Sequence, residues 1–408
     1  METNVQQLPT QADLVVVGGG ICGHACAASA ATRGASVVLV EKESGPAGEA
    51  SGRAQGSLRL QGRHPAERPL AQEAMTLWAA AGEENDDFEL VFGGNVYVCD
   101  DERELPMLHR FVEEAHRDGL TDVQLLTPEQ ARDRMPALRG PFVAALHSPV
   151  DGGCQPAEAT RFYAQKARKA GATLHYGVTA RNIVEHHGTV TAVATDHGTI
   201  VAPAVAVTAG VWTPYLTETL GIRIPIMPVA LSEAETTPSP PLFNETIRAF
   251  GFGARPRPDG RIVFSAGMNT TVDHQLTLYD LRQLRLWAPR LLRHWRDVRL
   301  SVDLTRIARQ IRAGTARSPE LIGSALGTRP NTRGLTAALG ALHRLIPGLD
   351  DAAIGRAWTG LVDMSPDGLP IIDGAAGPDG LVVVTGLSGH GFTLGPVIGE
   401  IAADLGGH

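Results

Sequence analysis

Short apolar runs separated by helical stretches open the chain. Residues 13–17 form an apolar run that glycines follow at once, and small residues over 25–33 then lead through Gly34 to a second apolar run at 36–40. A run of this length between turn residues is typical of a strand buried on both faces. The order strand, helix, strand predicts a βαβ unit on a parallel sheet.

The same pattern returns in the middle and at the end of the chain. Residues 157–170 have helical periodicity, with Pro156 in the first turn, where proline is tolerated. A strand at 381–384 leads through a glycine-rich turn into a last helix at 396–405. The other predicted strands of this kind are 173–176, 189–195 and 200–207. These segments predict one α/β unit assembled from three separate stretches of the chain.

The segments between these stretches have a different character. Strands are predicted at 247–252 and 261–265, before an arginine-rich helical run at 282–317. Acidic residues interleave with those arginines, which favours a solvated helix face or a subunit contact over a polyanion site. We therefore predict a discontinuous nucleotide-binding domain at residues 12–84, 151–214 and 328–408. The substrate-binding domain inserted into it comprises residues 85–150 and 215–327.

Composition narrows the class of protein further. The 408 residues are 43% apolar and 20% charged, as in an ordinary globular protein, and the length favours two domains. A net charge of −8 argues against nucleic acid or an anionic membrane as the main partner. The sequence shows neither an apolar run long enough for a membrane span nor a signal-peptide pattern, so we expect a cytoplasmic protein. The four cysteines lack metal-ligand spacing, and no metal site is predicted.

Glycines at three positions of the first strand–helix turn carry the clearest chemical signal. Gly18, Gly20 and Gly23 form G-x-G-x-x-G, which permits a tight turn, admits a pyrophosphate and lets the helix pack on the strand. The helix N-terminus favours the phosphate charge. Glu41 ends the second strand, where a carboxylate accepts hydrogen bonds from an adenosine ribose and disfavours a 2′-phosphate. The pattern predicts a dinucleotide and leaves NAD and FAD open.

Several ordered blocks of sequence resemble one flavoprotein family. Residues 50–62 read ASGRAQGSLRLQG, and residues 205–212 read VAVTAGVW. The C-terminal blocks 358–373 and 386–399 read WTGLVDMSPDGLPIID and GLSGHGFTLGPVIG. From residue 13 to about 405, the chain resembles the D-amino-acid oxidase, glycine oxidase and sarcosine oxidase family.

The resemblance implies a fold and a cofactor. The fold is α/β, with a Rossmann-like FAD-binding domain of the glutathione reductase type and an inserted α+β substrate domain built on an antiparallel sheet. FAD is expected to be noncovalent, because the flavin-linking cysteine of some relatives would fall near Gly360 and Cys154 is far from it in sequence. The implied cofactor-binding residues are Gly18, Gly20, Ile21, Cys22, Gly23, Glu41, Lys42, Ser51, Gly52, Val178, Ala209, Gly210, Trp212, Gly389, His390, Gly391, Phe392 and Thr393.

The sequence departs from the family on the substrate side. The positions at which relatives hold the substrate carboxylate with arginine or lysine fall here at Val362, Gly62 and Thr393. Either another basic residue binds the carboxylate or the substrate has none. Arg59 is the first candidate, because it lies close to the predicted flavin turn. The other candidates are Arg53, Arg255 and Arg257.

The oxygen-activating lysine of sarcosine oxidase-like relatives is also missing. Ser265 and Asn269 occupy the corresponding strand, which favours a dehydrogenase or a slow oxidase. The predicted catalytic residues are Arg59 and His390. The predicted substrate-pocket residues are Gln55, Val362 and Ser265.

Together these features predict an FAD-dependent amine or amino-acid oxidase or dehydrogenase. A small amine is expected to be held with its α C–H bond against flavin N5, and hydride transfer would give an imine. The electron acceptor is O2 or a partner redox protein, and homo- and hetero-oligomers both stay open. No catalytic base is assigned.

Three alternative functions stay open, and only the last of them belongs to a different class of protein. A hydroxy-acid dehydrogenase of the same superfamily would need a base such as His64 or His390 near the substrate hydroxyl. The flavin subunit of a hetero-oligomeric opine- or hydroxyproline-type dehydrogenase would pass electrons to a partner. A binding module would keep FAD as a structural element.

Overall fold

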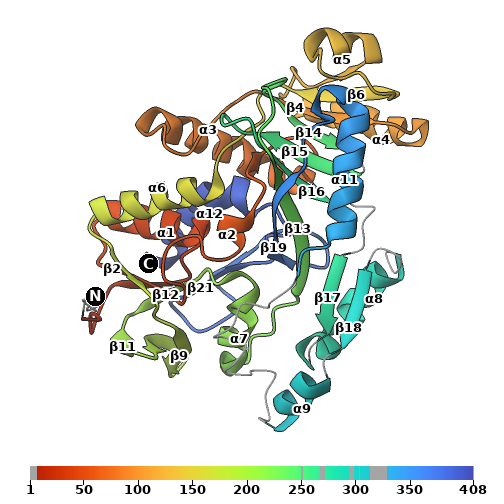
Figure 1. The fold of residues 1–408 in the computed structure, drawn as a ribbon. Helices are drawn as coiled ribbons and strands as arrows, with labels where there is room; N and C mark the ends of the chain where they lie inside the picture. The colour runs from red at the N-terminus through yellow and green to blue at the C-terminus, as the bar shows by residue number, and fades with distance from the viewer. Residues whose placement is uncertain are drawn as a thin grey trace.

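The computed structural model describes residues 7–249, 251–266, 272–276, 278–293, 298–302, 304–312 and 329–407 of the chain. Two large sheets with their covering helices make up most of this structure (Figure 1). Among the helices of these residues, none combines the length and apolar character that crossing a bilayer requires.

The first large sheet has six strands in the order β20-β21-β12-β1-β2-β8 and is parallel except for the pair β20–β21. Its strands are β1 (Leu14–Val17), β2 (Val37–Glu41), β8 (Thr173–Tyr176), β12 (Ala204–Val207), β20 (Ile371–Asp373) and β21 (Leu381–Thr385). In β1, Leu14 and Val16 pack against helices, whereas Val15 and Val17 pack against a small antiparallel sheet. Because both faces of β1 are covered, its sequence is an unbroken apolar run.

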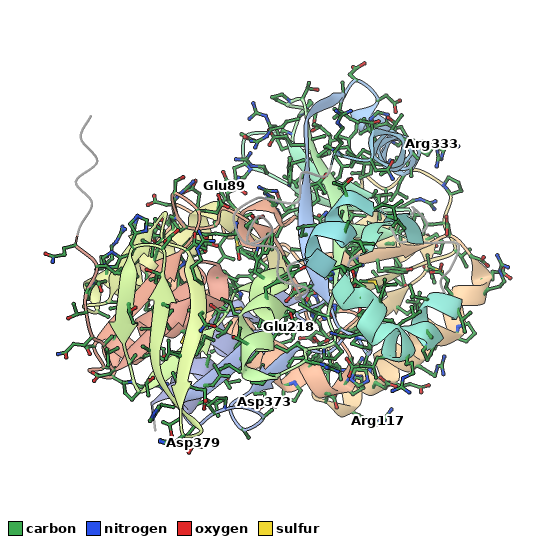
Figure 2. The ribbon with its side chains drawn as sticks, turned by 90° about the horizontal axis from the view of Figure 1, so that it is seen from below. Glu89, Arg117, Glu218, Arg333, Asp373 and Asp379 are labelled. Atoms are coloured by element: carbon green, nitrogen blue, oxygen red, sulfur yellow. The ribbon has the colours of Figure 1, made fainter. Side chains whose placement is uncertain are left out.

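Helices cover one face of this sheet and the small sheet covers the other (Figure 1). The helices are α1 (Ile21–Thr32), α3 (Arg68–Glu84), α6 (Pro156–Lys169) and α12 (Gly391–Gly406). The small sheet contains β9 (Ala180–His186), β10 (Thr189–Thr195) and β11 (Gly198–Val201). The loop between β20 and β21 reaches the start of β10, where the carbonyl of Asp379 accepts a hydrogen bond from the N–H of Val190 (Figure 2 labels Asp379).

The second large sheet has ten strands and is mostly antiparallel. Nine of them follow the order β18-β17-β13-β16-β15-β14-β4-β6-β5, and β19 pairs with β13. The strands are β4 (Asn95–Cys99), β5 (Gln124–Leu126), β6 (Ala144–Ser148), β13 (Met227–Thr236), β14 (Thr246–Ala249), β15 (Phe252–Pro256), β16 (Ile262–Ala266), β17 (Val272–Leu276), β18 (Val298–Val302) and β19 (Ile354–Met364). Helix α11 (Thr332–Leu345) packs on this sheet through Leu335 and Leu342, beside Phe264.

The remaining elements lie between and around these layers. The helices are α2 (Ala50–Arg53), α4 (Leu105–Arg117), α5 (Pro128–Arg134), α7 (Thr213–Thr217), α8 (Leu278–Arg293) and α9 (Leu304–Arg312). Strands β3 (Ser57–Leu58) and β7 (Gly152–Gly153) pair with each other. Single 3-10 turns are η1 (Pro65–Glu67), η2 (Glu102–Glu104), η3 (Gly210–Trp212), η4 (Glu218–Leu220) and η5 (Pro347–Leu349).

Three predicted elements have different bounds in the structure. The predicted strand at 200–207 is two strands of different sheets, β11 and β12, separated around Pro203, which has no N–H to continue a ladder. Residues 247–252 form the hairpin from β14 to β15 rather than one strand. The last helix begins at Gly391 and not at residue 396, so Pro396 lies inside it.

The second sheet also gathers segments from both sides of the predicted domain boundary at residue 328. Strand β19 follows that boundary, yet its hydrogen bonds run to β13. The arginine-rich run at 282–317 contains α8 and α9 with β18 between them, and residues 313–328 lie outside the described residues.

Candidate active site

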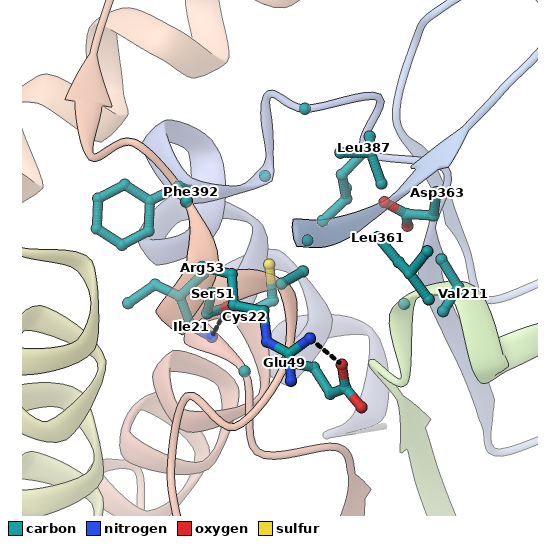
Figure 3. A pocket seen from close by; sticks show the side chains of 18 of the residues that line it. Ile21, Cys22, Glu49, Ser51, Arg53, Val211, Leu361, Asp363, Leu387 and Phe392 are labelled. Carbon is teal, nitrogen blue, oxygen red and sulfur yellow. Dashed lines mark hydrogen bonds and ion pairs between the residues drawn. The ribbon is translucent and has the colours of Figure 1, made fainter. Parts of the chain in front are cut away.

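A cavity of about 460 Å³ is lined by residues of both large sheets. Its walls come from the carboxyl ends of β1, β2 and β12, from the start of α1 and from β13–β16 and β19. The carboxyl ends of parallel strands are where open α/β sheets bind ligands. Figure 3 shows Ile21 and Phe392 on one side of the cavity and Leu361 and Asp363 of β19 on the other.

The glycine turn at the end of β1 has no room for side chains. Gly18 has φ 116°, and a Cβ there would lie 2.6 Å from the carbonyl oxygen of Thr208. A Cβ on Gly23 would lie 1.9 Å from the carbonyl oxygen of Gly18, so the helix can approach the turn only with glycine at this position. Gly20 is the N-cap of α1 and contributes no side chain, which leaves the first turn of the helix open to the cavity.

Glu41 and its neighbours form the end of the cavity next to β2. The Glu41 carboxylate accepts hydrogen bonds from the N–H groups of Gly19 and Glu43, at 2.5 and 2.8 Å. Burial raises the pKa of this carboxyl, and these hydrogen bonds oppose that rise. The N–H of Val178 donates to the Glu41 carbonyl at 2.9 Å, and Lys42 lies 5.4 Å from the centre of the Trp212 ring.

Helix α2 closes the cavity over the start of α1. Ser51 Oγ accepts a hydrogen bond from the N–H of Ile21 at 3.0 Å. Arg53 donates to the carbonyl of Thr359 at 3.2 Å and lies 3.9 Å from Glu49 (Figure 3). Arg53 is therefore engaged with β19 and α2 and is a weaker candidate for a substrate contact than the sequence indicates.

The turn from β21 to α12 forms the C-terminal wall. Gly386, Ser388 and Gly389 have φ of 68°, 52° and 82°. Ser388 Oγ accepts from the N–H of Ser365 at 3.0 Å, which ties the turn to the end of β19. Because α12 begins at Gly391, its N-terminal N–H groups and dipole lie at the cavity wall rather than one turn farther along.

His390 faces away from the cavity lining. Its Nδ1–H donates to Glu67 Oε1 at 2.8 Å, and burial lowers its pKa to about 4 against the opposing effect of Glu67. Thr393 is also outside the lining: its hydroxyl donates to the Ser57 carbonyl at 3.2 Å and accepts from Arg63 Nη2 at 3.0 Å. These two residues support the turn from behind.

Besides Arg53, three arginines line the cavity. They are Arg59, Arg63 and Arg248, the last from β14. Burial lowers the pKa of each, and the positive charges of Arg248 and Arg63 lower that of Arg59 further. Within the described residues, Arg248 has no hydrogen bond or ion pair, and Arg59 has one long contact of 3.4 Å, to the Gln61 carbonyl. This end of the cavity is suited to an anionic group of a ligand.

Most predicted site residues meet at this cavity. Those that line it are Gly18, Gly20, Ile21, Cys22, Glu41, Lys42, Ser51, Gln55, Arg59, Val178, Ala209, Gly210, Trp212, Ser265, Val362, Gly389, Gly391 and Phe392. Gly23, Gly52, His390 and Thr393 lie behind the lining, and Asn269 lies outside the described residues.

Sequence reasoning missed several cavity residues. They are Arg63, Tyr97, Glu233 and Arg248. Arg63 directly follows Gly62, one of the positions without an anchor, and a one-residue shift in that comparison would have found it. Glu233 and Arg248 are charged residues within strands, where a charge among apolar positions is the available signal.

The glycine turn, the acidic residue on the next strand and the cavity that continues to a second sheet define a dinucleotide-dependent oxidoreductase. The chain matches the family described as FAD dependent oxidoreductase over residues 13–405, and it belongs to that family. Its cofactor is FAD, and the bare glycine turn, Glu41 and the start of α12 fit this dinucleotide. Burial raises the pKa of the Cys22 thiol at this cavity to about 12, so the thiol stays protonated beside a noncovalent flavin.

Similar proteins include several enzymes that are named for amino-acid substrates. A D-amino acid dehydrogenase of Xanthobacter autotrophicus is 29% identical over 69% of this chain, and the match spans 56% of that enzyme. An N-methyl-L-tryptophan oxidase of Salmonella typhi is 25% identical over 96% of this chain and 94% of its own length. The solved L-amino acid deaminase from Proteus vulgaris superposes with a TM-score of 0.89 at 25% identity, covering 100% of this chain and 96% of the other.

Proposed function

We propose that this chain oxidises the C–N bond of an amino acid to an imine, with the substrate carboxylate bound by Arg59 and Arg248. The observation that carries the proposal is the pair of cavity guanidinium groups without strong partners. Each hydrogen bond from a guanidinium to a carboxylate contributes about 1.5–3 kcal/mol. The relatives named for amino acids support the same substrate class.

Arg63 is a candidate to replace the basic residues that hold the substrate carboxylate in related enzymes. It follows Gly62 in the sequence, and its guanidinium donates to Thr393, so it lies beside one of the positions that lack a basic residue. Its Nη1 is buried and has no hydrogen-bond partner among the described residues. We therefore include Arg63 as a third positive group that stabilises the bound carboxylate.

The chain's own residues then orient the substrate and exclude water. Acceptance of a hydride at N5 is the chemistry that FAD supplies when it is bound. Leu231, Phe252 and Val362 line the cavity with apolar surface, while the arginines fix one end of the substrate. Holding the α-carbon in one orientation is the main contribution we assign to these residues.

The proposal also assigns a role to each of the two large sheets. We propose that the first sheet is the core of a Rossmann-like FAD-binding domain of the glutathione reductase type, and that the second belongs to the inserted substrate-binding domain. The expected cytoplasmic location, the choice between O2 and a partner redox protein as electron acceptor, and the oligomeric state stay predictions.

A hydroxy-acid dehydrogenase is the less favoured reading of the same cavity. It would need a base at the substrate hydroxyl. His64 is exposed and accepts a hydrogen bond from the N–H of Ala66, while His390 is held by Glu67 behind the lining. Neither of the histidines that the sequence offers for this role is placed among the cavity residues. The lining does contain another carboxyl group, that of Glu233, so the comparison of amino acids with 2-hydroxy acids below decides between the two functions.

Anaerobic bleaching of the flavin tests the proposal. The holoenzyme is mixed with D- and L-amino acids, sarcosine, the matching amines without a carboxylate, and the matching 2-hydroxy acids. We expect bleaching by amino acids, slower bleaching by the amines and none by the hydroxy acids. A flavin that only hydroxy acids reduce, or that none of these compounds reduces, would refute the proposal.

A further inference from the structure

A buried carboxyl group stands in the part of the cavity wall that the second sheet forms. Glu233 belongs to β13, is 9% exposed and lines the cavity. Its backbone pairs with Ser265 in β16 and with Trp358 in β19, so it sits in the middle of the second sheet. Its Oε2 has no hydrogen-bond partner among the described residues.

The charged groups around Glu233 do not bond to this oxygen within the described residues. Arg255, in β15, directs its Nε to the carbonyl of Gln55 at 2.7 Å and forms no ion pair with Glu233 within the described residues. Arg257 is held by Glu89 and Glu235. Burial raises the pKa of Glu233 to about 8, against the opposing effects of Arg255 and of the N–H of Gln55.

A buried polar atom without a partner destabilises a fold, and its explanations include an ordered water and a catalytic or binding role. Because Glu233 lines the cavity, a group of the substrate is the partner that we consider. An amino acid offers two charged groups, and Arg59, Arg63 and Arg248 account for one of them. The remaining group is the ammonium, which is the complement of a carboxylate.

Building on the proposed function, we infer that Glu233 binds the substrate ammonium group and accepts one proton from it. An N–H bond of the ammonium breaks, an O–H bond forms on the Glu233 carboxylate, and the nitrogen keeps the electron pair. The neutral amine is then ready for loss of hydride from its α-carbon. Glu233 thus selects substrates that carry a basic nitrogen as well as a carboxylate, and it regenerates its carboxylate by losing the proton to solvent after turnover.

The proton balance predicts the pH dependence of kcat/KM for flavin reduction. The productive pair is the Glu233 carboxylate with the ammonium form of the substrate. The rate constant should therefore rise with pH up to about 8, level off, and fall above the pKa of the substrate ammonium. Without Glu233, only neutral amine reacts, and the rate constant should keep rising to the ammonium pKa and show no fall beyond it.

Glu233→Gln tests this inference because the amide keeps the shape of the protonated carboxyl. We expect a loss of about 100-fold in kcat/KM at pH 7, the usual scale of a proton-transfer group. The pH profile of kcat/KM should also change from bell-shaped to one that rises to a plateau. Glu233→Asp should keep the bell-shaped pH profile of kcat/KM. Glu235→Gln is the matched control, since Glu235 lies two residues along β13, pairs with Arg257 and is not part of the cavity lining.

Proton release on binding gives a second readout that needs no turnover. 2-Aminoisobutyrate has an ammonium and a carboxylate but no α-hydrogen, and isobutyrate lacks the ammonium. Calorimetric titration of the holoenzyme at pH 7 in two buffers of different ionisation enthalpy should show release of about one proton with 2-aminoisobutyrate. Isobutyrate, and either ligand with Glu233→Gln, should release none.

The outcomes separate the two proposals. If amino acids bleach the wild-type flavin but Glu233→Gln keeps the bell-shaped profile, the role of Glu233 is wrong and the proposed function stands. An equal loss of rate at every pH would indicate a structural role and also overturns the inference. If no amino acid bleaches the wild-type flavin, the proposed function itself fails.

Discussion

Replacing Arg248 by methionine removes one charge from the cavity while keeping most of the apolar stem. Arg248 has no hydrogen bond or ion pair within the described residues, so the change leaves no carboxylate of the protein unpaired. A guanidinium–carboxylate hydrogen bond contributes about 1.5–3 kcal/mol, which corresponds to a loss of about 10- to 150-fold in kcat/KM. Arg59 repels Arg248 whereas Asp151 attracts it, so the two effects oppose each other and the melting temperature should change little.

The assay compares two substrates that differ only in the carboxylate. Anaerobic stopped-flow bleaching is measured with the fastest amino acid of the screen and with the amine that lacks its carboxylate. Arg248→Met should slow the amino acid by the factor above and leave the amine unchanged. Arg261→Met is the control, because Arg261 pairs with Asp259 at the turn between β15 and β16 and does not line the cavity.

Two results would refute this reasoning. An equal loss for the amino acid and the amine would place Arg248 in a general structural role. An unchanged rate for both would mean that the carboxylate is bound elsewhere or is absent from the substrate. Either result would leave the assignment of FAD unchanged, because that assignment depends on the family match and the glycine turn and not on Arg248.

Three further predictions concern the cofactor side. Gly399→Ala should lower the unfolding free energy by about 2 kcal/mol, measured by denaturant titration, because its Cβ would lie 2.4 Å from Cβ of Ala25. Glu41→Gln should weaken FAD binding about 10-fold in a fluorescence titration of the apoprotein, through loss of a charge-assisted acceptor; unchanged affinity would contradict it. His390 has a folded pKa of about 4 against an ordinary value of 6.5, so the unfolded chain binds more protons between these pH values and stability falls on acidification. In melts at a series of pH values, the stability difference between wild type and His390→Asn should therefore shrink by about 3 kcal/mol from pH 6.5 to 4; a constant difference would refute this.

The cofactor end could be predicted because its requirements act on the backbone and are local in sequence. Gly18 has a positive φ and almost touches Thr208, so this position tolerates only glycine. Glu41 ends the neighbouring strand and lies where the sequence pattern places it. Spacing within 30 residues therefore specified the turn, the helix and the acid.

The end of the cavity that we propose for the substrate could not be predicted in the same way, because its geometry depends on long-range contacts. Arg63 lies beside Thr393 although 330 positions separate them. Arg255 was a candidate from its position, yet it is directed to the carbonyl of Gln55. Arg248 fell in a segment predicted as one strand, and the hairpin between β14 and β15 gives it its orientation.

This contrast follows from how each sheet meets the cavity. Parallel strands present their carboxyl ends to FAD, so the turns that follow them carry the binding groups and leave a pattern in the sequence. The second sheet contributes one of its faces to the cavity wall. Alternate positions of a strand lie on the same face, and Leu231 and Glu233 therefore both line the cavity from β13. A single substitution at such a position changes the charge or shape offered to the substrate without moving the backbone. Family resemblance is therefore a good guide to the cofactor and a poor guide to the substrate, for which the charged cavity residues of this chain are the better evidence.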